Sequence, residues 1–332
     1  MAKQINPSLA RIWQDHNQRR YGATTSNLVS VNSEAEHRAL DLLETGLTNA
    51  QFENLDVLAK IERRDLDPLL ARLGPLLTHT SHFLPELSAQ EVEQRFAEIL
   101  RLYSTGVQDP ARLMKLRSSQ TIFVSDLSVA GLIATRALFT IGFGSVITFD
   151  ATRVRSKDTA ELGYPAELIG ATRHQAACQL LGKTKSELRL HTRRGEGLEA
   201  VSAGLLLDND VVDPELYQPW MNRETPHIAV CFTELGASVS QLVLPGQTAC
   251  LACSEVEKMD RDPDWVKVAT QLNQLDRNFA DSSSLLTSLG LAIQRIALQL
   301  AGQEVSGGAL EYQAKTGQVV ELEPVTRNCG CR

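Results

Sequence analysis

The sequence predicts an α/β protein in which a doubly wound, mainly parallel sheet follows a smaller winged-helix-like α+β module. Short β-favouring runs alternate with helical patterns after residue 120, whereas short extended segments precede helices before about residue 90. With 332 residues, of which 43% are hydrophobic, the chain can bury more than one core. We therefore expect two domains, residues 1–110 and residues 111–332.

The expected amino-terminal module begins with three short strands, at residues 9–13, 20–23 and 27–31. Two capping boxes follow, Ser33 with Glu36 and Thr48 with Gln51, and each marks the start of a helix. Leucines at helical spacing over residues 69–76 and a pattern over residues 88–103 predict further helices. Three strands followed by three helices would form a winged-helix-like module, but a helical extension of the main domain fits the pattern equally well.

The expected main domain opens with a β-α-β unit at residues 121–125, 128–141 and 145–149. The elements expected after it are a helix at 171–181, strands at 203–207 and 227–232, a helix at 285–300, and a hairpin formed by 309–313 and 319–323. Alternating strands and helices of this kind predict a mainly parallel, Rossmann-like sheet that is covered on both faces.

Charge and composition exclude several classes of protein. The net charge is −7 and the basic residues are scattered, which argues against binding of nucleic acid or of an anionic membrane. Residues 127–149 come closest to a membrane span, but Arg136 interrupts them and a buried strand-helix-strand explains them better. The first 22 residues lack a signal-peptide core. We therefore expect a cytoplasmic protein.

Four of the six cysteines form two close pairs. Cys250 and Cys253 form a C-x-x-C pair, and Cys329 and Cys331 form a C-x-C pair. Zinc prefers four thiolates in a tetrahedron, and two pairs brought together by the fold supply them without an open position for water. The sequence therefore predicts a structural zinc site, with a redox pair or unbound thiols as the competing interpretations.

The turn after the first strand of the main domain lacks the glycines that a nucleotide-binding version of this fold requires. A phosphate must approach the backbone closely at this turn, where helix-start amides face the anion. Here the turn runs from Ser125 to Gly131, retains one glycine, and carries a negative charge at Asp126. This turn weighs against tight ATP binding.

Several polar residues are nevertheless candidates for a nucleotide site. Asp150 ends the second strand, where a carboxylate can accept hydrogen bonds from ribose. Asp208 and Asp210 end a later strand and could hold magnesium, while Arg153 and Arg173 could contact phosphate. The alternative for Asp150 is a plain strand end, and for Asp208 and Asp210 it is a solvated loop. The alternative for the two arginines is a lone surface position.

Residues from about 110 to 332 resemble the ThiF/MoeB and ubiquitin-activating-enzyme superfamily. The resemblance rests on the β-α-β unit, on Asp150, Asp208 and the cysteine pairs in this order, and on the segments 226–230, 244–253 and 260–265. It implies a homodimer that forms an acyl-adenylate on a peptide or small protein and has a four-cysteine zinc site. The same segments look like ThiF-type proteins of peptide-modifying gene sets, whose PqqD-like winged-helix module binds the leader of a precursor peptide.

The sequence also departs from that family. The glycine-rich loop falls on Ser125 to Ala130, including Ser128, and is not kept. The ribose aspartate falls on Asp150, the magnesium-associated aspartate on Asp208 or Asp210, and the adenylation lysine near Arg173. No cysteine lies between positions 253 and 329, so a covalent sulfur intermediate is not expected.

These features lead to one hypothesis with two rivals. The first is a ThiF-like partner protein of bacteriocin-type peptide biosynthesis, which binds a precursor leader and presents it to a cyclodehydratase-like enzyme, with little adenylation of its own. An active ATP-dependent adenylyltransferase is the alternative, and the missing glycines separate the two. A nicotinamide or flavin oxidoreductase ranks last because it needs the same loop.

Overall fold

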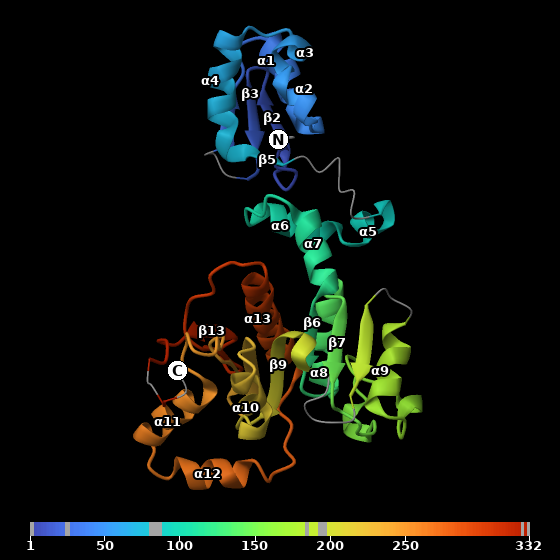
Figure 1. The fold of residues 1–332 in the computed structure, drawn as a ribbon, viewed down its shortest axis with the longest axis vertical. Helices are drawn as coiled ribbons and strands as arrows, with labels where there is room; N and C mark the ends of the chain where they lie inside the picture. Colours follow the sequence, from blue (N-terminus) through green and yellow to red (C-terminus); the bar gives the residue numbers. More distant parts are fainter. Residues whose placement is uncertain are drawn as a thin grey trace. The chain divides into compact units, whose positions relative to one another are not determined.

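A small sheet-and-helix unit, residues 1–115, precedes a larger α/β unit, residues 116–332 (Figure 1). The computed structural model describes residues 3–23, 27–79, 88–182, 186–191, 198–326 and 329–330. The division falls between Lys115 and Leu116, whereas the change in sequence pattern placed it after residue 110. No helix in the described ranges is long and apolar enough to cross a membrane.

Unit 1 contains two small antiparallel sheets. Its strands are β1 (Lys3–Ile5), β2 (Arg11–Asp15), β3 (Gln18–Tyr21), β4 (Leu28–Ser30) and β5 (Leu77–His79). Strands β2, β3 and β4 form one sheet in that order, and β1 pairs with β5 to form the other. The three-stranded sheet therefore comes from the three runs that the sequence pattern predicts, whereas the β1–β5 pair was not expected.

The helices of unit 1 follow the strands. They are α1 (Glu34–Thr45), α2 (Asn49–Glu53), α3 (Leu55–Ala59), α4 (Arg63–Leu73), α5 (Ala89–Gln94), α6 (Phe96–Ser104) and α7 (Pro110–Ser119), the last of which crosses the division. Ser33 caps α1 and the Thr48–Gln51 capping box starts α2. The prediction of a single helix over residues 88–103 is wrong, because the helix is interrupted at Arg95, which ends α5 and precedes α6.

Unit 2 is built on an eight-stranded sheet with the order β13-β12-β11-β10-β9-β6-β7-β8. The strands are β6 (Thr121–Val124), β7 (Ser145–Thr148), β8 (Glu187–Leu190), β9 (Val201–Asn209), β10 (His227–Thr233), β11 (Gly236–Val239), β12 (Leu310–Gln313) and β13 (Gln318–Glu321). Strands β6 to β10 are parallel and the last three are antiparallel. The mainly parallel, doubly wound sheet predicted from the sequence is confirmed.

Helices cover both faces of this sheet. The helices of unit 2 are α8 (Val129–Thr140), α9 (Arg173–Leu181), α10 (Pro214–Asn222), α11 (Leu251–Arg261), α12 (Trp265–Leu272) and α13 (Ser282–Leu300), of which α12 buries no residue. Neighbouring β6 residues point to opposite faces: Ile122 packs in the core that contains α8 and α13, whereas Phe123 packs in the core that contains Trp220 of α10. This two-faced burial explains why the parallel strands appear in the sequence as continuous apolar runs.

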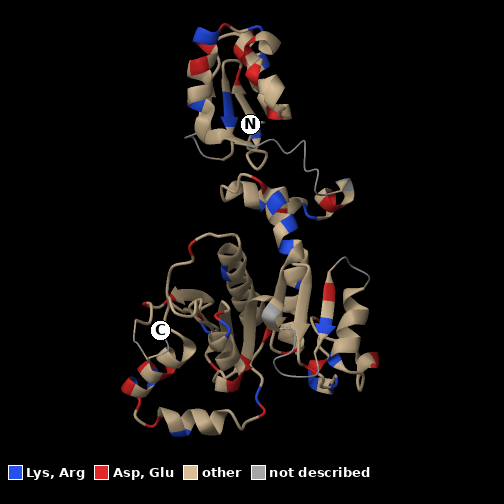
Figure 2. Ribbon diagram, viewed as in Figure 1, with Lys and Arg blue, Asp and Glu red and all other residues tan. Residues whose placement is uncertain are grey.

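Charged residues of both signs are interspersed along the helices and strands of the two units (Figure 2). Together with the net charge of −7, this pattern describes a mixed-charge surface. One group of charged residues lies at the carboxyl ends of the parallel strands.

Candidate functional site

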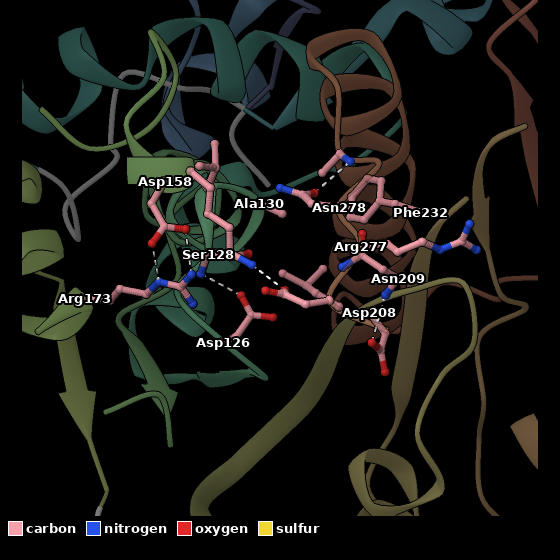
Figure 3. Close-up of a pocket in the computed structure, with 15 residues that line it drawn as sticks. Asp126, Ser128, Ala130, Asp158, Arg173, Asp208, Asn209, Phe232, Arg277 and Asn278 are labelled. Carbon is pink, nitrogen blue, oxygen red and sulfur yellow. Dashed lines mark hydrogen bonds and ion pairs between the residues drawn. The ribbon is translucent and has the colours of Figure 1, made fainter. Parts of the chain in front are cut away.

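A cavity of about 210 Å³ opens at the carboxyl ends of β6, β9 and β10 (Figure 3). The strand order reverses between β6 and β9, and doubly wound sheets bind ligands at such a switch point. The polar residues that line the cavity are Asp126, Ser128, Lys157, Asp158, Arg173, Asp208, Asn209, Asp276, Arg277 and Asn278. The first helical residues of α8, Val129 and Ala130, complete one wall, so the site meets a helix amino terminus.

The turn between β6 and α8 binds carboxylates of the protein itself. The backbone N–H of Ser128 donates to Asp126 Oδ1 over 2.7 Å, and that of Leu127 donates to Asp150 Oδ2 over 2.8 Å. Burial raises the pKa of Asp126, while hydrogen bonds from Ser128 oppose that rise. Two amides that could face a phosphate at this turn therefore already donate to carboxyl groups of the protein.

Gly131 is the one glycine in this turn, and the structure shows why a side chain is excluded there. A Cβ atom at this position would overlap the backbone carbonyl of Asp126. The helix can therefore pack against the preceding turn only if residue 131 has no side chain. Gly131 preserves the shape of the turn, whereas Asp126 and Ser128 change its chemistry.

Asp150, predicted as a ribose ligand, belongs to a buried charge network. Its carboxylate accepts hydrogen bonds from Leu127 and Thr152 and lies 3.2 Å from Arg173 Nη1. Arg173 Nη2 also lies 2.6 Å from Asp158 Oδ1. Burial alone would raise the pKa of Asp150, but the hydrogen bonds and the Arg173 charge hold it below its usual value. Arg173 thus neutralises two carboxylates of the protein, and Figure 3 shows its ion pair with Asp158.

The two aspartates after β9 differ in their surroundings. Asp208 lines the cavity and accepts backbone N–H groups from Asn209 over 2.8 Å and Asp213 over 3.0 Å. Burial raises its pKa to about 6. Asp210 instead forms a two-point ion pair with Arg277, whose Nε lies 2.9 Å from Asp210 Oδ2. The structure therefore presents Asp208 to the cavity and gives Asp210 a fixed cationic partner.

Two other sequence candidates lie outside the cavity lining. Ser125 Oγ accepts the backbone N–H of Leu207 over 2.8 Å, which ties β6 to β9. Arg153 is exposed, and its guanidinium donates to the carbonyl oxygen of Gly170. Of the four residues predicted to bind a cofactor, the structure places only Ser128 in the cavity wall, with Asp150 directly behind it.

Four charged residues of the cavity wall were not predicted from the sequence. Lys157 pairs with Asp276, and Asp158 and Arg277 take part in the two ion pairs described above. Lys157 and Asp158 lie in a three-residue 3-10 helix, Asp276 and Arg277 lie in the loop before α13, and only the fold brings them together. No local signal in the sequence identifies them.

A second candidate site is formed by cysteines. Among the described residues, the Sγ atoms of Cys250, Cys253 and Cys329 lie within 4.8 Å of one another. Cys250 Sγ is 3.8 Å from Cys253 Sγ and 3.5 Å from Cys329 Sγ. A tetrahedral zinc with Zn–S bonds of about 2.3 Å places its sulfur atoms about 3.8 Å apart. The three sulfur atoms therefore fit a thiolate metal site.

The other three cysteines and the oxidation state of Cys329 complete the description of the cluster. Cys331, the predicted fourth ligand, lies outside the described residues. Cys329 is disulfide-bonded in the structure, so a metal would take this sulfur only after reduction, because the ligand is the thiolate. Cys178 is exposed and Cys231 is buried in β10, and neither belongs to the cluster.

Comparison with known proteins gives one curated relative and several solved structures. No family model matches the chain. The ubiquitin-like modifier-activating enzyme 5 of Oryza sativa subsp. japonica is 22% identical over 260 residues, which cover 71% of this chain. The match covers 57% of that enzyme, so this chain spans little more than half the length of the curated relative.

The solved structures are similar over almost the whole chain. Escherichia coli MccB with ATP has a TM-score of 0.70 at 12% identity, covering 100% of this chain and 99% of that one. MccB with AMPCPP and MccA has a TM-score of 0.72 at 12% identity, with coverage of 100% and 98%. PaaA has a TM-score of 0.69 at 16% identity, with coverage of 96% and 99%. At these identities the likeness establishes the fold.

Proposed function

Because this chain is a ThiF/E1-like superfamily protein by fold, we propose that it acts in peptide modification as a partner protein. In this proposal unit 1 binds the leader of a precursor peptide and the protein presents that peptide to a cyclodehydratase-like modifying enzyme. Its own adenylation activity is weak or lost. The protein works as a cytoplasmic homodimer with a structural zinc ion at its cysteine cluster.

The observation that carries this proposal is the self-occupied turn between β6 and α8. The amides of Leu127 and Ser128 already donate to Asp150 and Asp126. A phosphate about 5 Å from the ionised Asp126 carboxylate would meet a repulsion of about 3 kcal/mol per pair of unit charges at an effective dielectric constant of about 20. Because burial already raises the pKa of Asp126, protonation of this carboxyl group limits the repulsion, and a loss of affinity of roughly a hundredfold for an anionic nucleotide is its upper bound.

The cations of the cavity support the same conclusion. Lys157 is paired with Asp276, and Arg277 with Asp210. Arg173 lies between two buried carboxylates. A nucleotide could recruit any of these charges only by breaking an existing ion pair, and for Arg173 and Arg277 this would leave a buried carboxylate uncompensated. The cavity therefore offers phosphate little net attraction.

Titration calorimetry with Mg-ATP tests the loss of nucleotide binding. We expect no saturable heat in the micromolar range for the full chain. The variant Asp126→Gly with Ser128→Gly removes the carboxylate and places two glycines in the turn, so it should bind more tightly than the parent. Saturable micromolar binding by the parent protein would overturn the partner-protein proposal.

The peptide-binding half of the proposal rests on unit 1. Its three-stranded sheet has β2 and β4 at its edges, and its helices bury a separate core that includes Leu40, Leu43 and Leu69. Among the similar structures, several contain MccB together with MccA. Fluorescence anisotropy with labelled precursor peptides encoded beside the gene tests this half directly. Failure of all such peptides to bind the full chain would count against leader recognition.

An active adenylyltransferase remains the second candidate because the cavity lies at the switch point and Asp208 faces it. MccB, which has a similar fold, has been solved with ATP. Peptide-dependent exchange of labelled pyrophosphate into ATP separates the two candidates. The partner-protein proposal expects no exchange above background, whereas an adenylyltransferase requires it.

A further inference from the structure

Gln241 lies between the two halves of the cysteine cluster. Its side-chain Nε2 donates to the carbonyl oxygen of Ala249 over 2.8 Å, and its Oε1 accepts the backbone N–H of Val325 over 3.1 Å. The orientation of the amide is unambiguous, because a carbonyl oxygen can only accept and a backbone N–H can only donate. One buried side chain, 6% exposed, therefore bridges segments that lie far apart in the sequence.

The two hydrogen bonds of the Gln241 side chain reach the two segments that carry the clustered cysteines. Ala249 directly precedes Cys250, which is the N-cap of α11, and Cys253 lies in the first turn of that helix. Val325 belongs to the carboxyl-terminal segment that leads to Cys329, and it packs against the core that contains the C-x-x-C pair. Gln241 thus ties the segment around Val325 to the residue that precedes the C-x-x-C pair.

Contacts that involve no cysteine hold Gln241 itself in place. Ser240 Oγ accepts the N–H of Ala229 in β10 over 3.0 Å and donates to the carbonyl oxygen of Gln241 over 2.9 Å. The carbonyl oxygen of Ser240 accepts a hydrogen bond from Arg295 of α13 over 3.1 Å. The sheet and the longest helix therefore place Gln241 before any metal binds.

We propose that Gln241 is a positioning residue for the metal held by Cys250, Cys253 and Cys329, because it docks the carboxyl-terminal segment beside the C-x-x-C pair in advance. Docking removes part of the ordering cost that a free segment would add to metal binding. Hydrogen-bonding groups behind metal ligands commonly change metal affinity 10- to 100-fold when they are removed. The inference rests on metal occupancy of the cluster and is independent of the peptide-binding proposal.

Competition between the reduced full chain and a chromophoric zinc chelator tests this role. Gln241→Met keeps a long unbranched side chain and removes both hydrogen bonds, so we expect its zinc affinity to fall about tenfold or more. Thr135→Val is the matched control, because it removes a buried hydrogen bond to Gly131 in α8, away from the cysteines. Its zinc affinity should stay within about twofold of the parent.

Hydrogen exchange of the metal-free protein provides a second measurement. In the presence of a chelator, the segment around Val325 should exchange faster in Gln241→Met than in the parent, whereas Thr135→Val should leave it unchanged. If Gln241→Met does not fold, Gln241→Glu replaces it: this variant keeps an acceptor for Val325, lacks the donor to Ala249, and should also bind zinc more weakly than the parent.

The outcomes distinguish failure of metal binding by the cluster from failure of the positioning role of Gln241. A reduced parent protein that binds no zinc removes the metal and the proposed role together. Zinc affinities of the parent and the Gln241 variants that agree within about twofold would refute the positioning role while leaving the metal site intact. Unchanged exchange around Val325 in Gln241→Met would refute advance docking.

Discussion

Removing Arg173 should destabilise unit 2 strongly, because this residue neutralises two buried carboxylates. Its side chain is 12% exposed, and the side chains of Asp150 and Asp158 are 3% and 5% exposed. Arg173→Met keeps much of the aliphatic packing and removes the charge together with its hydrogen bonds. The variant therefore leaves two carboxylates without a cation.

The expected magnitude follows from the burial of the network. Deleting one partner of a buried ion pair costs about 3–5 kcal/mol, and the partial exposure of Arg173 favours the lower end. A loss of about 3 kcal/mol corresponds to a decrease in Tm of about 6–12 °C for a unit of this size. Urea denaturation followed by circular dichroism at pH 7 measures the free energy of unfolding directly.

The pH dependence of this loss provides a further check. The pKa of folded Asp150 lies below its ordinary value of 3.8, so its stabilising contribution is present above about pH 4 and is lost as pH falls through the folded pKa. Without the Arg173 charge, which lowers its pKa, Asp150 takes up a proton more readily. The difference between parent and variant should therefore be largest at pH 7 and shrink towards pH 4.

Arg153→Met is the matched control, because Arg153 is exposed and bonds only a backbone carbonyl in the described part of the chain. It should change the free energy of unfolding by less than about 0.5 kcal/mol. Adding Asp158→Asn to Arg173→Met should recover part of the loss, because it removes one of the uncompensated charges. A cost below about 1 kcal/mol for Arg173→Met, or one independent of pH, would refute the reasoning.

Three further predictions concern the turn, the cavity and the cysteines. Gly131→Ala should destabilise the protein by at least about 1–3 kcal/mol in urea denaturation, whereas Gly290→Ala, which has open space in α13, should stabilise it by about 0.5–1 kcal/mol; equal effects would contradict the close packing at the turn. The pKa of folded Asp208 is about 6 against an ordinary 3.8, so its burial cost is full above pH 6 and is relieved as pH falls towards 4. Relative to Asp208→Asn, the parent should therefore gain about 1–3 kcal/mol between pH 7 and pH 4, and parallel pH profiles of the unfolding free energy would exclude this. Cys250→Ser should abolish zinc binding in elemental analysis of reduced protein, while Cys231→Ser retains it; equal zinc contents would argue against the cluster.

Much of the fold could be predicted from the sequence because burial and capping leave local patterns. Strands β6, β7, β9 and β10 are covered on both faces and therefore appear as continuous apolar runs. Helix α8 has Ser128 as its N-cap, and the side chain of this serine accepts a hydrogen bond from the backbone N–H of Gly131. The C-x-x-C and C-x-C spacing likewise predicted the cluster of Cys250, Cys253 and Cys329.

Other elements leave no comparable pattern. Strand β8 is a half-buried edge strand and β11 has only four residues, two of them Gly and Ser, so neither forms an apolar run. Helix α10 contains Pro219, and α12 has no buried residue. The existence of β8, β11 and α10 depends on tertiary contacts that the local sequence does not encode, and α12 has no buried face that a core-facing pattern could reveal.

The cavity likewise has features that the sequence reveals and features that only the fold reveals. The loss of the glycines could be recognised in the sequence, but the partner of each charge could not. Arg173 pairs with Asp158 fifteen residues away and Arg277 pairs with Asp210 sixty-seven residues away. Such pairs form only when parallel strands bring their carboxyl ends to one edge of the sheet.

The pairing of β1 with β5 has a consequence for how unit 1 could be joined to other proteins. Residues 3–5 lie beside residues 77–79, so the segment enters and leaves its core at neighbouring points. A segment with adjacent ends can be inserted into a host loop without stretching the host backbone. Residues 3–79 are therefore suited to transplantation, by gene fusion or in the laboratory, into an unrelated enzyme.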